Sequence, residues 1–150
     1  MAGRLAMMAR PLGGKRLTED IEALRAEGVG KVLSLLETDE AAELHLTNEA
    51  EICAANGIAF VSFPIPDRGL PADDAAFAAT TKALADEIAK GETVVVHCRA
   101  GIGRSSLAAA SILVLAGMPA AQALELLTKA RGVTVPDTEA QRAWILRQRR

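Results

Sequence analysis

The sequence has little of what secreted, membrane-spanning or disulfide-rich proteins need. It contains only two cysteines in 150 residues, too few for a disulfide framework, so a reducing, cytoplasmic location is expected. The longest apolar run, residues 107–118, is far shorter than the roughly 20 residues of a membrane span, so no membrane partner is expected. The first residues are too short and too interrupted by arginine for a secretory signal.

An excess of charge of one sign is also missing. Seventeen basic residues face 19 acidic ones, for a net charge of −2, so nothing indicates a nucleic-acid partner. Two histidines and two cysteines lack the spacing of metal ligands, and neither a metal site nor a cofactor is expected. Half of the residues are hydrophobic, which is enough for the core of one domain over residues 1–150.

Short apolar runs alternate along the chain with segments of helical periodicity. Strands are expected over residues 5–8, 31–36, 58–63 and 93–97, and helices over 18–28, 38–45, 47–57, 72–90, 105–116, 119–130 and 138–149. Thr18 is the expected cap of the first helix. The run at 93–97 is nearly all β-branched, which is typical of a strand buried in a parallel sheet. Strands separated by helices predict an α/β domain with a central, mostly parallel sheet flanked by helices.

One segment concentrates the chemistry, residues 97–105 (HCRAGIGRS), where a strand leads through a glycine-containing loop into a helix. Unpaired backbone N–H groups and the positive end of the helix dipole converge at such a junction and bind anions. Gly101 and Gly103 let the backbone curl so that successive N–H groups point inward, and Arg104 can close the ring. The expected phosphate ligands are Arg99, Ala100, Gly101, Ile102, Gly103 and Arg104.

Cys98 begins this loop. A helix N-terminus and a nearby arginine favour the thiolate form of a cysteine, which is its nucleophilic form. A small buried cysteine without function is the alternative. That alternative does not account for Arg104 and the two glycines in the same loop, so a nucleophile is expected.

HCRAGIGRS is similar to the signature His-Cys-x5-Arg-Ser/Thr of the cysteine-based protein tyrosine phosphatases, and the chain resembles their compact, bacterial-like dual-specificity members. The resemblance implies a central, mainly parallel sheet flanked by helices and metal-independent hydrolysis of phosphate monoesters through a phosphocysteine. Cys98 would attack phosphorus while Arg104 and the loop backbone hold its oxygens. Ser105 would assist the departing sulfur, and His97 would order the loop.

The same resemblance implies a general acid on a separate loop. Asp67, within residues 64–71 (PIPDRGLP), lies 31 positions before Cys98 and follows a strand expected to end at the same sheet edge. A plain turn residue is the alternative. Asp73 and Asp74 are second candidates, although both fit the first turn of the following helix.

Further side chains have a functional and a structural interpretation. Gln141 lies near the place where some relatives of the resembled family have a water-positioning glutamine, but residues 138–141 also spell a capping box, which is the favoured interpretation. Arg68 and Arg99 are candidates to add positive charge around the pocket. Cys53 is expected to fill the core, with a resolving thiol for an oxidised Cys98 as the alternative. His45 is expected to face solvent.

The chain lacks tyrosine and has four other aromatic residues, so a shallow pocket is expected that admits phosphotyrosine and phosphoserine or phosphothreonine. The partner would be a phosphorylated protein or a small phosphorylated substrate. A phosphate-binding module without turnover and a rhodanese-like sulfurtransferase are the alternatives. The combination of Cys98, Arg104 and Asp67 favours the phosphatase. Arsenate reduction would need a second cysteine near Cys98, for which Cys53 is only a remote candidate.

Overall fold

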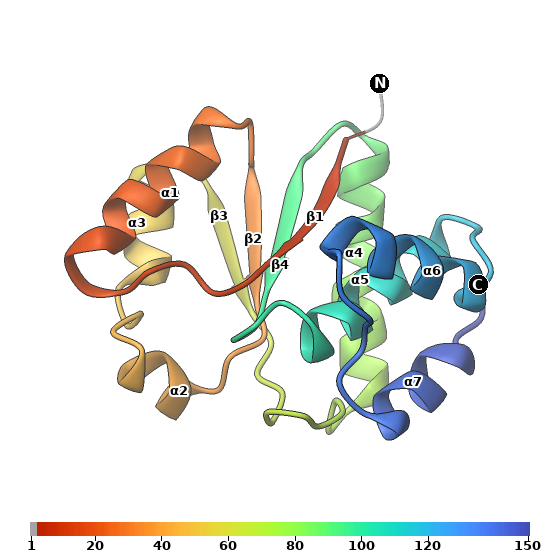
Figure 1. Ribbon diagram of the computed structural model, residues 1–150. Helices are drawn as coiled ribbons and strands as arrows, with labels where there is room; N and C mark the ends of the chain where they lie inside the picture. The colour runs from red at the N-terminus through yellow and green to blue at the C-terminus, as the bar shows by residue number, and fades with distance from the viewer. Residues whose placement is uncertain (1–2) are drawn as a thin grey trace.

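A computed structural model describes residues 3–150 and places four strands in one sheet (Figure 1). The strands are β1 (Leu5–Met8), β2 (Lys31–Ser34), β3 (Ala59–Ser62) and β4 (Val94–His97), in the order β1-β4-β2-β3. All three pairings are parallel. This confirms the predicted α/β class, and in the described chain the sheet is parallel throughout.

Helices cover both faces of the sheet. They are α1 (Leu17–Ala26), α2 (Thr38–Glu43), α3 (Glu49–Ala55), α4 (Asp74–Ala89), α5 (Gly103–Leu115), α6 (Ala120–Arg131) and α7 (Glu139–Leu146), with a short 3-10 turn η1 (Gly14–Arg16) before α1. In Figure 1, α1 and α3 lie to the left of the strands and α4 to α7 lie to the right. No helix within residues 3–150 has the length and apolar character that a membrane span requires.

The core has two parts, one on each face. Val32 and Val95 point toward α1 and α3, whereas Leu33, Val94 and Val96 point toward α4 to α7. Successive strand residues face opposite sides, and both sides are apolar here because helices cover both. Nearly all of α5 is buried, in keeping with a helix that contains most of the longest apolar run of the sequence.

Two predicted helix starts are wrong. The helix α1 begins at Leu17 with Arg16 before it and no side-chain cap, so Thr18 lies in its first turn and caps nothing. The reason is η1, a 3-10 turn that continues directly into α1 and leaves no extended residue for a cap. The helix α5 begins at Gly103 rather than at residue 105, so Arg104 belongs to its first turn.

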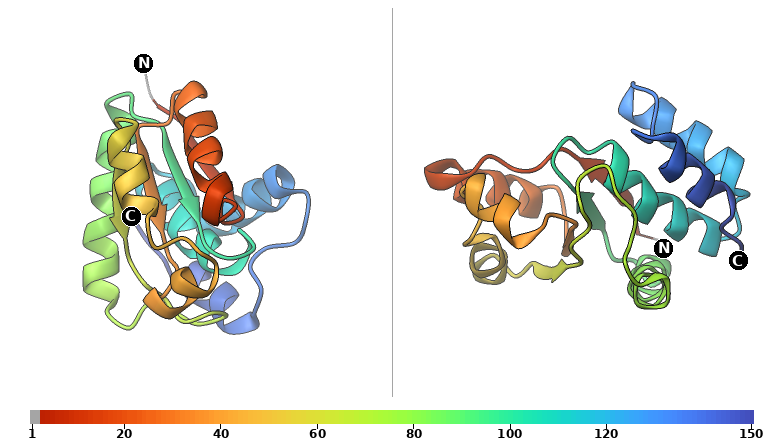
Figure 2. Two further views of the ribbon diagram at one scale, coloured as in Figure 1. Left: turned by 90° about the vertical axis from the view of Figure 1, so that its left-hand side faces the viewer. Right: turned by 90° about the horizontal axis from the view of Figure 1, so that it is seen from below.

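Parallel strands bring their carboxyl ends to one edge of the sheet, where ligands bind in α/β folds. The right-hand view of Figure 2 is seen from below and shows the loops after β3 and β4 at this edge. The predicted meeting of the Cys98 and Asp67 loops is therefore confirmed in topology.

Candidate active site

The sulfur of Cys98 lies among hydrogen-bond donors at the end of β4. Its side chain is buried, and Sγ accepts hydrogen bonds from the backbone N–H of Gly101 at 3.3 Å and from Ser105 Oγ at 3.1 Å. Both donors point at the atom that would carry the negative charge of a thiolate nucleophile or leaving group. The first turn of α5 starts within a few residues and adds the positive end of its dipole.

Gly101 gives the loop of residues 98–104 its curl. Its φ is +73°, a left-handed conformation that glycine adopts without strain. A Cβ at this position would lie 2.4 Å from the carbonyl oxygen of Met8, which is backbone and has no rotamer to move. Glycine is therefore needed here both for conformation and for space.

Arg104 is almost completely buried, and its guanidinium is held on two sides. On one side it forms a two-pronged pair with Glu40, at 2.6 Å from Nη1 and 3.0 Å from Nη2. On the other side Nη1 donates to Ile65 O at 2.9 Å and Nη2 to Asp67 Oδ1 at 3.2 Å. Hydrogen bonds from Arg104 hold the pKa of Glu40 below its usual range, although burial acts in the opposite direction.

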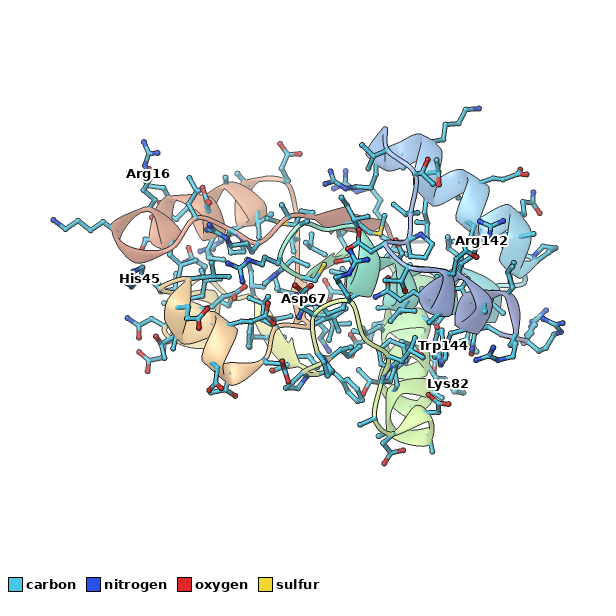
Figure 3. The ribbon with its side chains drawn as sticks, turned by 60° about the horizontal axis from the view of Figure 1, so that its bottom comes forward. Arg16, His45, Asp67, Lys82, Arg142 and Trp144 are labelled. Carbon is cyan, nitrogen blue, oxygen red and sulfur yellow. The ribbon has the colours of Figure 1, made fainter. Side chains whose placement is uncertain are left out.

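Asp67 shares a hollow of about 170 Å³ with Cys98 and Arg104. The complete lining is Asp67, Arg68, Cys98, Arg99, Ala100, Gly103, Arg104 and Asp137. Figure 3 shows Asp67 near the middle of this face. Arg68 has a φ of +61°, uncommon for a residue with a side chain and a form of backbone strain that clusters at functional sites.

The two fallback carboxylates have structural partners instead. Asp73 caps α4 by accepting a hydrogen bond from the N–H of Ala76 at 3.0 Å. Asp74 accepts one from Trp144 Nε1 at 3.2 Å. Of the three predicted aspartates, Asp67 is the one that lines the hollow with the sulfur.

His97 is buried behind the loop and paired with an acid. Its Nε2 lies 2.6 Å from Glu49 Oε2 and its Nδ1 lies 3.2 Å from the carbonyl oxygen of Cys98. A carbonyl oxygen only accepts, so Nδ1 is the donor in this contact, and Nε2 faces the carboxylate of Glu49. This pair fixes the direction in which the chain leaves β4.

Gln141 is fully buried and both ends of its amide are engaged. Its Oε1 accepts from the backbone N–H of Asp137 and of Thr138, and its own N–H bonds to Thr138 Oγ1, so the predicted capping box is present. Its Nε2 donates to Gly69 O at 3.1 Å, which links α7 to the loop that carries Asp67. These contacts indicate a structural role for Gln141, which joins α7 to the loop of Asp67.

The remaining candidates lie away from the hollow. Cys53 packs between the sheet and α1, on the face opposite the core cluster that contains Cys98, which confirms it as a core residue. Burial, with a smaller effect of Glu49, raises the pKa of Cys53 to about 12, so its thiol stays protonated. His45 is exposed as predicted, at the outer end of the molecule in Figure 3. No cluster of three or more potential metal ligands occurs within residues 3–150.

Sequence reasoning missed three acidic residues of the site. Glu40 and Glu49 stand 64 and 48 positions from their partners, on short helices whose sequence shows only ordinary acidic first turns. Asp137 precedes the cap of α7 and lines the hollow. Buried acidic side chains are rare unless paired, but burial itself could not be read from these helices.

Comparison with known proteins gives a family and a fold. The family model described as "Tc-R-P: Polymorphic toxin system, DSP-PTPase phosphatase" matches residues 6–118. Among curated proteins, mouse "Cyclin-dependent kinase inhibitor 3" is 29% identical over 119 residues. The match covers 79% of this chain and 56% of that protein, so the chain spans little more than half the length of this relative.

Solved structures show the same fold at low identity. Kinase associated phosphatase, crystallised with a serine in place of its catalytic-site cysteine, has a TM-score of 0.86 at 24% identity, covering 94% of this chain and 83% of its own. PTPMT1 in complex with PI(5)P has a TM-score of 0.78 at 22% identity, covering 95% of this chain and 88% of its own.

Proposed function

The chain belongs to the family of polymorphic toxin system DSP-PTPase phosphatases, within the cysteine-based protein tyrosine phosphatase superfamily, and on that premise we propose the reaction and its residues. Residues 1–150 act as one phosphatase domain that hydrolyses phosphate monoesters through a phosphocysteine. The observation that carries the proposal is the common hollow of Cys98, Arg104 and Asp67. Nucleophile, oxyanion ligand and proton donor meet there.

In the first step, the thiolate of Cys98 attacks phosphorus, the S–P bond forms and the ester P–O bond breaks. The backbone N–H groups of residues 99–104 and the guanidinium of Arg104 hold the three phosphoryl oxygens, whose charge increases in the transition state. Asp67 donates its proton to the leaving oxygen. The contact of 3.2 Å between Asp67 and Arg104 Nη2 is exchanged for a phosphate oxygen on binding, while Glu40 keeps the guanidinium in place.

In the second step, water attacks the phosphocysteine and the Asp67 carboxylate takes its proton. The S–P bond breaks, and the electron pair returns to the sulfur as a thiolate. The hydroxyl of Ser105, at 3.1 Å from Sγ, stabilises the charge on the departing sulfur. Products are inorganic phosphate and the regenerated enzyme.

The substrates are phosphorylated proteins, on tyrosine and on serine or threonine, or small phosphorylated molecules. No aromatic side chain is among the residues that line the hollow, so nothing there selects for a phenyl ring. Exposed Arg68 and Arg99 add positive charge at the rim, opposed by Asp137. Initial rates on matched phosphotyrosine and phosphoserine peptides test this point, and strict tyrosine selectivity would contradict it.

Hydrolysis of p-nitrophenyl phosphate in excess chelator tests the proposed reaction. We expect Cys98→Ser to abolish turnover and Asp67→Asn to lower kcat by about 100-fold or more, as loss of a general acid does. Asp86→Asn is the matched control and retains activity, because Asp86 is an exposed carboxylate on α4 that pairs with Lys82. Turnover that survives Cys98→Ser, or that chelator removes, would overturn the phosphocysteine mechanism.

A further inference from the structure

Arg131, the last residue of α6, reaches the outside of the 98–104 loop. Its Nε donates to the carbonyl oxygen of Gly101 and its Nη2 to that of Ala100, each at 3.0 Å. The two carbonyls are consecutive, so the planar guanidinium binds them as a fork. A last-turn arginine ordinarily complements the dipole of its own helix, but these two bonds go to a segment 30 and 31 positions away.

The direction of these carbonyls determines whether the loop binds an anion. When the N–H groups of a loop converge on a phosphate, its C=O groups must point away from it and need partners outside. The other outward carbonyls have such donors: His97 Nδ1 for Cys98, Arg10 N for Arg99 and Ser106 Oγ for Ile102. Arg131 supplies the donors for the two carbonyls at the apex of the loop.

We propose that Arg131 is a positioning residue that holds the loop in its anion-binding conformation. This inference rests on the proposed function of the loop. Without Arg131, the carbonyls of Ala100 and Gly101 bond to water, and their peptide groups are free to rotate. Rotation turns N–H groups away from the phosphate and away from the sulfur of Cys98, to which the N–H of Gly101 now donates.

Three variants distinguish a positioning role of Arg131 from an effect of its positive charge and from a general loss of protein stability. Arg131→Met removes the fork and the charge while keeping the apolar stem of the side chain. Arg131→Lys keeps the charge but has a single ammonium that cannot reproduce the planar fork. Lys129→Met is the matched control, because Lys129 is an exposed cation two positions earlier on α6 with no hydrogen bond or ion pair to the described chain.

The first readout is binding of orthophosphate by titration calorimetry, together with KM and kcat for p-nitrophenyl phosphate. We expect Arg131→Met to weaken orthophosphate binding by about tenfold and to raise KM, with Arg131→Lys between it and the wild type. Lys129→Met stays within about twofold. Partial unfolding would instead reduce the amount of active enzyme, which lowers the apparent kcat and leaves KM unchanged. Orthophosphate affinity and KM of Arg131→Met equal to the wild type would overturn the inference, and so would Arg131→Lys that matches the wild type.

The second readout needs neither turnover nor ligand. Amide hydrogen exchange of Gly101 is expected to accelerate in Arg131→Met by a larger factor than that of the core amides in β2. Equal factors would mean a general loss of stability and would refute the positioning role. If Arg131→Met does not fold, the same comparison is made with Arg131→Lys. A wild type that binds orthophosphate but never turns over would refute the proposed function while leaving this inference tested.

Discussion

Replacing Glu40 tests whether the buried guanidinium of Arg104 depends on a paired carboxylate, because Glu40 neutralises its charge. Arg104 is 1% exposed, and its two-pronged contacts with Glu40 are 2.6 and 3.0 Å long. Replacing Glu40 by glutamine keeps the shape but removes the charge, and leaves one amide NH2 facing the donors of Arg104. Breaking a buried pair in this way costs about 3–5 kcal/mol. Because Asp67 also contacts Arg104, we expect the lower end, about 3 kcal/mol.

Urea and thermal denaturation followed by circular dichroism measure this cost. For a domain of this size, about 3 kcal/mol corresponds to a Tm lower by roughly 6–12 °C. Orthophosphate should restore more stability to Glu40→Gln than to the wild type, because it supplies the anion that Arg104 has lost. Glu43→Gln, exposed on the same helix, is the control and should stay within about 0.5 kcal/mol. A Glu40→Gln variant as stable as this control would refute the reasoning.

The pH dependence has a definite sign. The pKa of Glu40 is lowered in the folded protein, so its ionised form contributes stability above the unfolded value of about 4.3. That contribution is lost as the pH falls through the lowered folded value. The gap in unfolding free energy between wild type and Glu40→Gln is therefore full at pH 7 and narrows below about pH 4. A gap that widens on acidification would contradict this assignment.

Three further substitutions have defined outcomes. Gly101→Ala should abolish orthophosphate binding, measured by calorimetry, because the added Cβ would lie 2.4 Å from a backbone oxygen. Gly57 also has a positive φ but open space around it, so Gly57→Ala should lower the free energy of unfolding by only about 1 kcal/mol and retain binding. Glu49→Gln should lower the unfolding free energy in urea by about 1–3 kcal/mol, since it takes the anionic partner from the buried His97; an unchanged value would count against that pair. Gln141→Leu should lower kcat and leave the inhibition constant of orthophosphate within about twofold, because it loosens the loop of the proposed acid and not the phosphate site. An equal loss of phosphate affinity would show that Gln141 supports the phosphate site instead.

Much of the fold and the centre of the site could be predicted because their determinants are local. The loop from Cys98 to Arg104 combines a nucleophile, two glycines and an arginine within seven positions, and a β-branched strand and an apolar helix flank it. Asp67 was expected from the resemblance and from its spacing of 31 positions to Cys98, and its loop lies at the Cys98 edge because parallel strands end at the same edge. Within residues 3–150, local patterns predicted the strands and α-helices to within a few residues, although the η1 turn displaced the cap expected at Thr18.

The groups that hold the site in place could not be predicted in the same way. Glu40, Glu49 and Arg131 find their partners across 64, 48 and 30 or 31 positions, and each sits on a helix where an acidic first turn or a basic last turn is ordinary. Periodicity shows which face of a helix is apolar, but not which charged residue near that face turns inward to pair. Those contacts depend on how α2, α3 and α6 pack around the loop.

The central claim is that phosphate passes through a covalent bond to Cys98, and trapping that bond tests it most directly. The enzyme is mixed with p-nitrophenyl phosphate, quenched with acid within milliseconds and digested for mass spectrometry. We predict one phosphoryl group on the peptide that contains Cys98 in the wild type, and none in Cys98→Ser. In Asp67→Asn the phosphorylated peptide should accumulate, because the attack of water then lacks its base. A turning-over wild type with no phosphoryl group on this peptide, or with one on another residue, would contradict the account.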